Sequence, residues 1–414
     1  MLVCVGTLLW AVMLSVRACE ATTAPDPPRR FMASMSADST LRLAPPVNRF
    51  GADLLSAMYA ADSQKNLALC PPALMVALGT AWMGSANETR DALGRVLRLH
   101  GLDGTAAVPA FQRLAREMAG LPGCSWGASL WVMDGIPLDP AFAAQARAIS
   151  KTTCGQVDFS EPTIAKSINA WAKRTSAGTV VRVVDATRAN TSILMACAAS
   201  ISAPFDTVMT PVVDGVFCSS DGTQRKIRFL EGHIRCRHIK DSRFELAGIP
   251  CRGGRLALYV IMPRTSTSLV QLLHDAAGGN LDRWILASQT EQGVVRLPAF
   301  EASSSGSLLS AIRSLGANPA TDERAEFPGI SKVTRLRIDA IAHGALIDVG
   351  GEGIGSSLPP ATARRPEVGP GGPPTAQFDL TADGPFLWAL RDDAAGVTLF
   401  LGIVEEPAVS PAGR

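Results

Sequence analysis

GGEGIGSSLPPATARRPEVGPGGPPTA, residues 350–376, is the segment from which the fold can be worked out, because its composition is unusual and strand-like sequence lies on both sides. Six prolines and seven glycines fall between positions 350 and 375, which predicts a loop or linker instead of a packed element. Loops of this length are uncommon inside a compact domain and are usually functional or disordered. An exposed functional loop and a passive linker are therefore the two interpretations.

The sequence around this loop predicts a mixed fold. Strand-like runs cover 335–349 before it and 386–404 after it, and the apolar runs 256–262 and Val397–Val404 are typical of strands buried on both faces. Helical spacing of apolar residues characterises the first half of the chain instead. The expected helices cover 47–58, 74–82, a run opened by Asn87, Ile164–Thr175 and, later, 308–315. This arrangement predicts the α+β class.

The composition is that of a chain with a large buried core. Of 414 residues, 47% are apolar and 18% are charged, which excludes a disordered protein of low hydrophobicity. The net charge of +2 is too small to indicate attraction to nucleic acid or to a membrane surface. No repeat and no break in composition divides the chain, so residues 47–407 are expected to form one domain.

The N-terminus has the features of a secretory leader. Residues 2–16 are almost wholly apolar and uncharged, and the run is shorter than the ~20 residues that a membrane-spanning helix needs. Small residues follow at Ala18 and Ala21, which predicts a signal peptide over 1–21 and a secreted, extracellular protein. No Lys or Arg precedes the apolar run, and a short membrane anchor is the alternative. A flexible segment over 22–46 and a short tail over 408–414 complete the expected organisation.

Cysteines and sequons are compatible with secretion. Of nine cysteines, seven remain when a leader containing Cys4 and Cys19 is removed, and an odd number cannot pair completely within one chain. Asn87 and Asn190 each open an acceptor sequon for N-glycans. Asn87 has a competing role as the N-cap of the helix that follows it.

Metal and enzyme motifs are weak in this chain. His233, Cys236 and His238 are close in sequence, but their spacing matches no common zinc pattern, and strand alternation would put His233 on the opposite face from the other two. We therefore expect no metal and no cofactor. No Gly-x-Ser-x-Gly elbow occurs, and no helix is expected after the glycines of 351–355, so a hydrolase or dinucleotide-binding enzyme is not indicated.

Several short motifs resemble the serpin family, and they occur in the family's order over nearly the whole mature chain. Each is weak alone, and the order makes the set specific. The motifs are Asn66 with the block 70–74, the segment 84–97, Val157-Asp158-Phe159, Ile168-Asn169-Ala170-Trp171, 175–178, Ile249-Pro250 with the strand up to Pro263, Leu297-Pro298-Ala299-Phe300, 343–349, Pro385-Phe386-Leu387-Trp388, Leu399-Phe400-Leu401-Gly402 and Pro407.

This resemblance implies a serpin fold, with three β-sheets wrapped by eight or nine helices and an exposed reactive-centre loop at about 350–376. It implies an inhibitory mechanism and not an enzyme. A serine protease cleaves the loop and stays attached by an acyl bond, while the freed loop inserts as a new central strand into the largest sheet of a metastable fold. The implied hinge of the loop is Glu352, Gly353, Ile354, Gly355, Ser356 and Ser357. The implied gate, where the sheet opens, is Asn66, Cys70, Cys197 and His343.

The hinge departs from the family pattern at Pro359 and Pro360. Proline has no N–H for a strand ladder, so two in succession would leave two carbonyl groups unpaired, at about 1–3 kcal/mol each. An inhibitor that traps a protease by insertion and a non-inhibitory binder, carrier or decoy substrate are therefore both open.

The gate also departs from the family pattern. Cys70, Ala73 and Cys197 stand where the family commonly has Ser, Ser and Asn, so the hydrogen-bond network around His343 is expected to be thin. His343 is then either a gate residue or simply a buried core histidine.

The bait residue is either acidic or basic. The family's hinge length, counted from Gly353, places the scissile bond after Glu367, whereas Arg364 and Arg365 would suit a trypsin-like protease. Pro366 disfavours cleavage after Arg365, which makes Arg364 the better basic candidate. The alternative for the arginine pair is a solvated surface pair. The expected partner is a serine protease, and the chain is expected to be a monomer.

A basic run suggests a second partner, an acidic glycosaminoglycan. A solvated strand face is the alternative interpretation. The run consists of Arg225, Lys226, Arg228, Arg235, Arg237 and Lys240.

Overall fold

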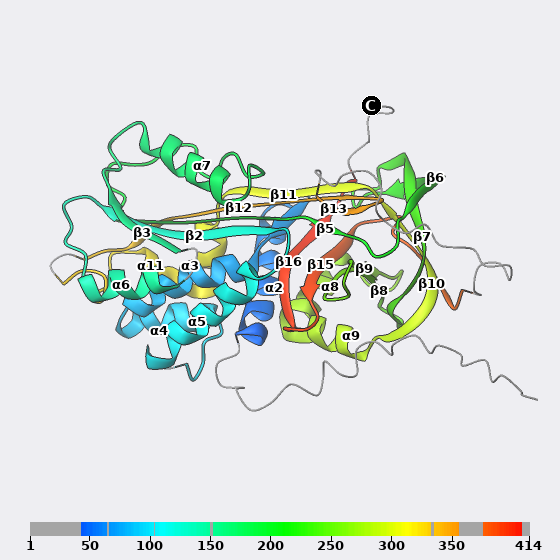
Figure 1. The fold of residues 1–414 in the computed structure, drawn as a ribbon, viewed down its shortest axis with the longest axis horizontal. Coiled ribbons are helices and arrows are strands. Elements are labelled where there is room, and N and C mark those ends of the chain that lie inside the picture. The colour runs from blue at the N-terminus through cyan, green and yellow to red at the C-terminus, as the bar shows by residue number, and fades with distance from the viewer. Residues whose placement is uncertain are drawn as a thin grey trace, which may run out of the picture. The chain divides into compact units, whose positions relative to one another are not determined.

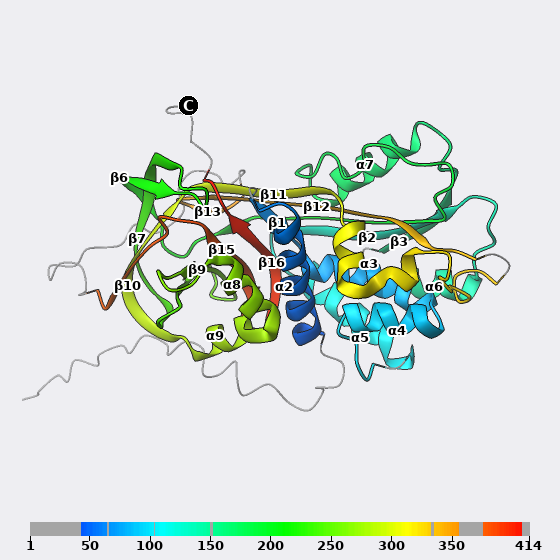
Figure 2. The same ribbon diagram turned by 180° about the vertical axis from the view of Figure 1, so that it is seen from behind.

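A computed structural model gives the fold and describes residues 43–407, except 64–65, 103, 150–151, 333–334 and 356–375. The side chains of 104–105 and 212–214 are also outside the description. Two sheets and the helices that cover them make up the described part (Figures 1 and 2), and its α+β class is the predicted one. The predicted leader and the C-terminal tail lie outside the described residues.

The seven-stranded sheet carries the segment that leads into the loop. Its strands run in the order β3-β2-β4-β12-β13-β5, and β11 pairs with the opposite edge of β12. Their bounds are β2 Cys124–Met133, β3 Thr152–Val157, β4 Ile193–Ile201, β5 Ala203–Pro204, β11 Phe300–Ser307, β12 Ile338–Gly350 and β13 Gly353–Ile354. At its centre β4 and β12 are parallel neighbours, in a register that places Cys197 beside His343.

The nine-stranded sheet runs in the order β1-β16-β15-β9-β8-β7-β10-β14, with β6 paired to β7. Its strands are β1 Leu67–Leu69, β6 Thr210–Cys218, β7 Gln224–Lys240, β8 Phe244–Pro250, β9 Leu256–Pro263, β10 Gln289–Pro298, β14 Phe378–Thr381, β15 Phe386–Asp392 and β16 Val397–Val404. The resemblance implied three sheets, and β7 explains the difference. With 17 residues it pairs with β6 at its start and with β8 at its end, so it joins two sheets into one ladder.

The helices cover both faces of the seven-stranded sheet, with α7 on one face and α3 to α6 on the other (Figure 1). Their bounds are α2 Ala44–Ala61, α3 Pro71–Gly84, α4 Asn87–Val96, α5 Gly104–Ala119, α6 Pro140–Ala148, α7 Ile164–Thr175, α8 Leu269–Asp275, α9 Leu281–Ala287, α10 Leu309–Ile312 and α11 Asn318–Thr321. Helix α3 is buried on nearly every side, and α7 packs through Ile168 and Ala172 onto the outer face of the sheet. No helix in the described ranges is long and apolar enough to cross a bilayer.

Two predicted helix starts are wrong in detail. Helix α2 begins at Ala44, so positions 44–46 belong to the domain and not to the flexible segment. Pro45 and Pro46 lie in the first turn, where a missing N–H breaks no helical hydrogen bond. Helix α4 has Ala86 as its N-cap, and Asn87 is its first residue with no capping bond.

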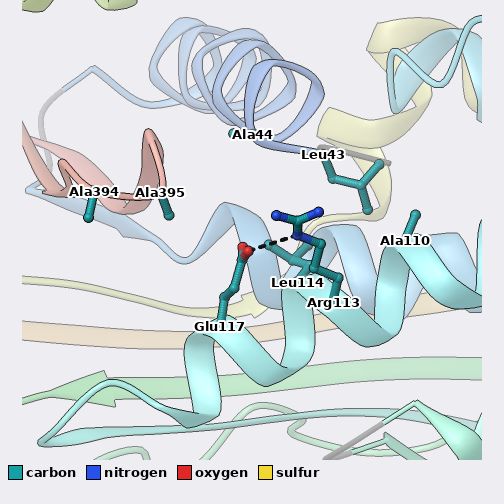
Figure 3. Close-up of a pocket in the computed structure, with 8 residues that line it drawn as sticks. All are labelled: Leu43, Ala44, Ala110, Arg113, Leu114, Glu117, Ala394 and Ala395. Atoms are coloured by element: carbon teal, nitrogen blue, oxygen red, sulfur yellow. Dashed lines mark hydrogen bonds and ion pairs between the residues drawn. The ribbon is translucent and has the colours of Figure 1, made fainter. Parts of the chain in front are cut away.

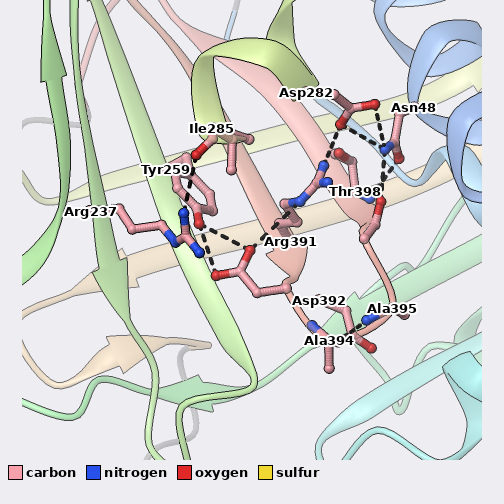
Figure 4. Close-up of polar contacts among 12 residues, drawn as sticks. Asn48, Arg237, Tyr259, Asp282, Ile285, Arg391, Asp392, Ala394, Ala395 and Thr398 are labelled. Atoms are coloured by element: carbon pink, nitrogen blue, oxygen red, sulfur yellow. Dashed lines mark hydrogen bonds and ion pairs between the residues drawn. The ribbon is translucent and has the colours of Figure 1, made fainter. Parts of the chain in front are cut away.

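The turn between β15 and β16 is fixed by a network of polar side chains (Figure 4). Arg391 donates to Asp282 of α9 at 2.5 Å, and Asn48 of α2 donates to both oxygens of Asp282 at 2.9 and 3.1 Å. Tyr259 of β9 donates to Asp393 at 2.8 and 3.0 Å. Helices α2 and α9 are thereby bonded to the two C-terminal strands.

Candidate functional site

The first residues of the loop segment form a strand, which the sequence did not indicate. After Gly350 the chain turns through Gly351 and Glu352, and β13 then runs antiparallel to both β12 and β5. The amide of Gly355 donates to Asp348 at 2.7 Å on one side, and Glu352 accepts from Phe205 at 2.9 Å on the other. Residues 353–354 are thus packed between two strands, and the expectation that 350–376 holds no packed element is wrong there.

Gly353 allows this close approach. Its φ is 141°, in the region that favours glycine, and a Cβ atom would lie 2.5 Å from the carbonyl oxygen of Ala203. Ile354 follows with its side chain fully buried in the main core. The hinge residues Glu352 to Gly355 are therefore seated in the sheet. Ser356, Ser357, Pro359, Pro360, Arg364, Arg365 and Glu367 lie outside the described residues.

Below β13 the sheet closes directly, because β4 and β12 pair with each other. The side chains along this seam are mostly small, with Ala196 to Ala199 on β4 and Ala342, Gly344 and Ala345 on β12. Such side chains add little contact across the pair beyond the backbone ladder. Separating β4 from β12 would therefore lose little contact between their side chains.

His343 is the one large polar group in the seam. Its Nε2 accepts a hydrogen bond from the backbone N–H of Cys70 at 3.2 Å, and its Nδ1 has no partner in the described part of the chain. Burial lowers the pKa of His343 to about 3, so the ring is neutral at physiological pH. Because Nε2 accepts, the ring hydrogen lies on Nδ1, where it is buried and unsatisfied.

The predicted gate residues do not all meet. Cys70 bonds to His343, and Cys197 lies opposite His343 in the strand register. Asn66 lies just before β1, and its side chain binds backbone groups of Glu301, Glu405 and Glu406 at 2.6–3.0 Å. It joins β1 to the end of β16 instead of touching the histidine.

The gate thiols are structural groups. Burial raises the pKa of both Cys70 and Cys197, so neither forms a reactive thiolate at neutral pH. The seven cysteines in the described part of the chain are all free, and Cys218 is the one that is exposed. The structure therefore places no disulfide across the seam.

The segment that connects α7 to β4 covers the seam. Val180 and Val183 pack against Gly344 of β12, where a Cβ atom would lie 2.3 Å from the nearest methyl group of Val180. Ser200 of β4 donates to the carbonyl of Ser176 at 2.8 Å, and Ser305 of β11 donates to that of Arg182. The connection touches three strands at once, so a new strand between β4 and β12 would have to displace it.

The two predicted N-glycan acceptor sites, at Asn87 and Asn190, differ in the surroundings of their side chains. The Asn87 side chain donates to Glu326, and the hydroxyl of Thr89 in the same sequon is buried, with bonds to Pro319 and Glu326. Asn190 is exposed in the connection that covers the seam.

Two cavities in the described part of the chain lie in different regions of the fold. A cavity of about 90 Å³ lies between the start of α2, α5 and the β15–β16 turn, where Arg113 pairs with Glu117 at 3.1 Å (Figure 3). That volume is far below the roughly 300 Å³ of an ordinary ligand pocket. A larger cavity of about 410 Å³ lies between the connection from α7 to β4 and the first residues of β12.

The basic run is largely engaged in contacts of its own. Arg225 pairs with Glu406 at 2.9 Å, Lys240 pairs with Glu245 at 2.8 Å, and Arg237 donates to the carbonyl of Ile285 at 3.3 Å. Lys226 and Arg235 are exposed. The six residues do not form one free cationic face.

The hinge strand β13 thus lies at the end of a β4–β12 seam that is lined mostly by small side chains. The family model described as Serpin (serine protease inhibitor) matches residues 46–407, and the chain belongs to this family. Serpin-Z7 of Hordeum vulgare is 25% identical over 389 residues, which cover 87% of this chain and 96% of that protein.

Two solved structures show the same fold. Native tengpin, a thermophilic serpin, superimposes with a TM-score of 0.80 at 17% identity, covering 90% of this chain and 95% of its own. Human thyroxine-binding globulin superimposes with a TM-score of 0.77 at 17% identity, covering 89% of this chain and 100% of its own.

Proposed function

We propose that this chain is a secreted serpin that offers the segment after Gly355 to a serine protease and traps the protease by inserting that segment between β4 and β12. The observation that carries the proposal is β13. Its two residues already lie between a neighbour on each side, and they run antiparallel to both, as a strand inserted from this end must. The leader over 1–21 and the sequon at Asn190 support secretion.

The register of β13 predicts where each further residue would go. In an antiparallel pair of strands, the two residue numbers of every facing pair have the same sum. This sum is 703 for β13 with β12, from Val349 and Ile354, and 557 for β13 with β5, from Ala203 and Ile354. By this arithmetic Ala363 would face Ala340 on one side and Leu194 on the other, and these two are themselves partners in the closed sheet. In this register the seam would accommodate residues up to 363. The inserted segment would then end next to Arg364, one of the candidate cleavage positions.

The same register assigns a partner to each hinge proline. Pro359 would face Gly344 of β12 and Ala198 of β4, and Pro360 would face His343 and Cys197. Gly355 bonds to β12 and Glu352 to β5, so in a continued strand odd-numbered residues would hydrogen-bond to β12 and even-numbered ones to the β4–β5 side. Insertion would therefore leave the carbonyl groups of Gly344 and Cys197 without a donor, at about 1–3 kcal/mol each.

The test is to cleave the loop with trypsin and measure the melting temperature of the full chain before and after. The variant Pro359→Ala/Pro360→Ala restores both donors, and Pro373→Ala/Pro374→Ala is the matched control, because that pair lies beyond Arg364. We expect the first variant to gain a higher melting temperature faster than wild type and the control to behave like wild type. A variant that gains no stability on cleavage, and forms no SDS-stable complex with trypsin, would overturn trapping.

A non-inhibitory role is the second candidate, and Pro359 with Pro360 favours it. Human thyroxine-binding globulin, which shares the fold, is a binding protein by its name. For this chain the role is supported if cleaved wild type keeps its melting temperature while Pro359→Ala/Pro360→Ala gains stability. That outcome means that the scaffold can accept a strand and that the natural loop does not supply one.

A further inference from the structure

Strand β14 is the first described element after the loop, and its backbone pairing is limited. It has four residues and lies at the edge of the nine-stranded sheet, parallel to β10. Two amides next to it continue this pairing, from Gln377 to Gln292 at 2.7 Å and from Ala382 to Arg296 at 2.8 Å. A short parallel edge strand is weakly held by its backbone alone, so its side chains decide how firmly it is attached.

Phe378 is the main side-chain anchor of β14. Its ring stacks on the imidazole of His238, with centroids 3.9 Å apart and planes only 4° from parallel. Gly293 of β10 leaves room for the ring, because a Cβ atom there would lie 2.2 Å from it. Asp379 adds a second contact, accepting from Arg296 at 2.5 Å. The stacking of Phe378 therefore depends on the His238 ring being held parallel to it.

Two carboxylates hold His238 in that orientation. Nδ1 lies 2.7 Å from Glu291 of β10, and Nε2 lies 3.2 Å from Glu245 of β8. Carboxylates only accept hydrogen bonds, and a neutral imidazole has one N–H, so both contacts are hydrogen bonds only when both ring nitrogens carry hydrogen. The geometry is therefore that of an imidazolium ring, which also attracts the face of Phe378.

The other charged and titratable groups around the His238 ring do not take over its role as the partner of Glu291. Lys240 and Arg264 both pair with Glu245, at 2.8 and 3.5 Å, whereas His238 is the one basic partner of Glu291 within the described residues. Cys236, on the same strand, is buried, which raises the pKa of its thiol to about 12 and keeps it neutral. Burial alone would lower the pKa of His238, but Glu245 and Glu291 more than offset it, and the pKa is raised.

We propose that His238 is a pH-sensitive anchor for β14: the doubly protonated ring, fixed by Glu245 and Glu291, holds Phe378, and loss of its proton loosens the strand that follows the loop. A neutral ring keeps one of its two carboxylate bonds and can pivot about it. Because the pKa is raised, the anchor is complete below pH ~6.5, the value of a free histidine, and weakens as the pH rises through the folded value. The anchor acts whether or not the loop traps a protease.

Hydrogen exchange of the full chain, read by mass spectrometry on peptides covering 376–382, tests this anchor between pH 6 and 9. After correction for intrinsic exchange rates, wild-type protection should fall by about threefold to tenfold across the titration, the range of a cation–aromatic contact. Peptides from β15 and β16 provide the internal reference. Glu291→Gln, which removes one acceptor charge, should shift the fall to lower pH.

Two further variants separate the anchor from a general effect of pH. His233→Gln, on the same strand with an exposed ring, is the matched control and should keep the wild-type profile. His238→Gln should show low protection that does not change with pH. Phe378→Leu keeps an apolar side chain without the flat ring and should also lose the pH dependence. The proposal is overturned if Phe378→Leu and His238→Gln retain the wild-type pH dependence, or if His233→Gln abolishes it.

Discussion

The β15–β16 turn and the seam between β4 and β12 are held in opposite ways, although strands from both regions contribute to the main hydrophobic core. At the turn, Arg391, Asp282 and Asn48 form hydrogen bonds between strand and helix (Figure 4). At the seam, small side chains face one another and His343 keeps an unsatisfied nitrogen. The turn is therefore cross-linked by polar side chains, whereas the seam is held mainly by its backbone ladder.

The largest expected effect comes from breaking the turn. Arg391→Ala should lower the free energy of unfolding by about 3 kcal/mol, because it leaves the carboxylates of Asp282 and Asp393 without their buried partner. Urea unfolding measures this. Arg324→Ala is the control, because Arg324 is exposed and solvent screens its pair with Asp322, so a much smaller loss is expected. Equal losses in the two variants would remove the distinction between turn and surface.

The next effect is a pH dependence at the seam. His343 has a pKa of about 3 in the folded state, below the ~6.5 of the unfolded state, so the unfolded state binds more protons as the pH falls. Between pH 7 and pH 5 this group should cost about 2 kcal/mol of stability, at up to about 1.4 kcal/mol per pH unit. The loss should be absent from His343→Gln and present in His100→Gln, whose histidine is exposed in wild type. Parallel unfolding curves for wild type and His343→Gln across this range would contradict the burial argument.

The smallest effect concerns the connection that covers the seam. Gly344→Ala should destabilise the chain by about 1 kcal/mol, because its Cβ pushes against Val180 and Val183 while the loss of glycine flexibility in the unfolded state offsets part of the cost. Gly155→Ala, on β3 of the same sheet with open space around its Cβ, should stay within about 0.5 kcal/mol of wild type. Thermal unfolding of both variants decides the point, and a neutral Gly344→Ala would mean that the connection is not tightly packed on β12.

Part of the secondary structure could be predicted, and the errors at two of the missed boundaries have local causes. The predicted bounds of α7 and β16 agree with the structure, since apolar spacing and an unbroken apolar run are strong signals. The helix start at Ala44 was missed because Pro45 and Pro46 read as loop residues, although both suit a first turn. Strand β13 was missed because two residues among glycines carry no periodic signal.

The candidate sites show a similar limit. The sequence pairs Cys70 and Cys197 with His343 only through resemblance to a family, and it places Asn66 there although Asn66 binds the end of β16. In the sequence His238 belongs only to a weak metal-ligand pattern, whereas in the structure its partners are carboxylates from β8 and β10. No sequence spacing could have indicated those partners, because they come from two strands other than the one that carries His238.

The sequence by itself determined the α+β class, the positions of several helices and of strands β9, β12, β15 and β16, and the prolines that oppose a continuous strand, because these depend on local periodicity and on the chemistry of single residues. Only the tertiary structure decided that β4 and β12 are neighbours, that β13 lies at the top of their seam, and that His238 supports Phe378. The physical reason is that strand pairing uses backbone groups common to all residues, so partners far apart in the chain are selected by the packing of the whole core.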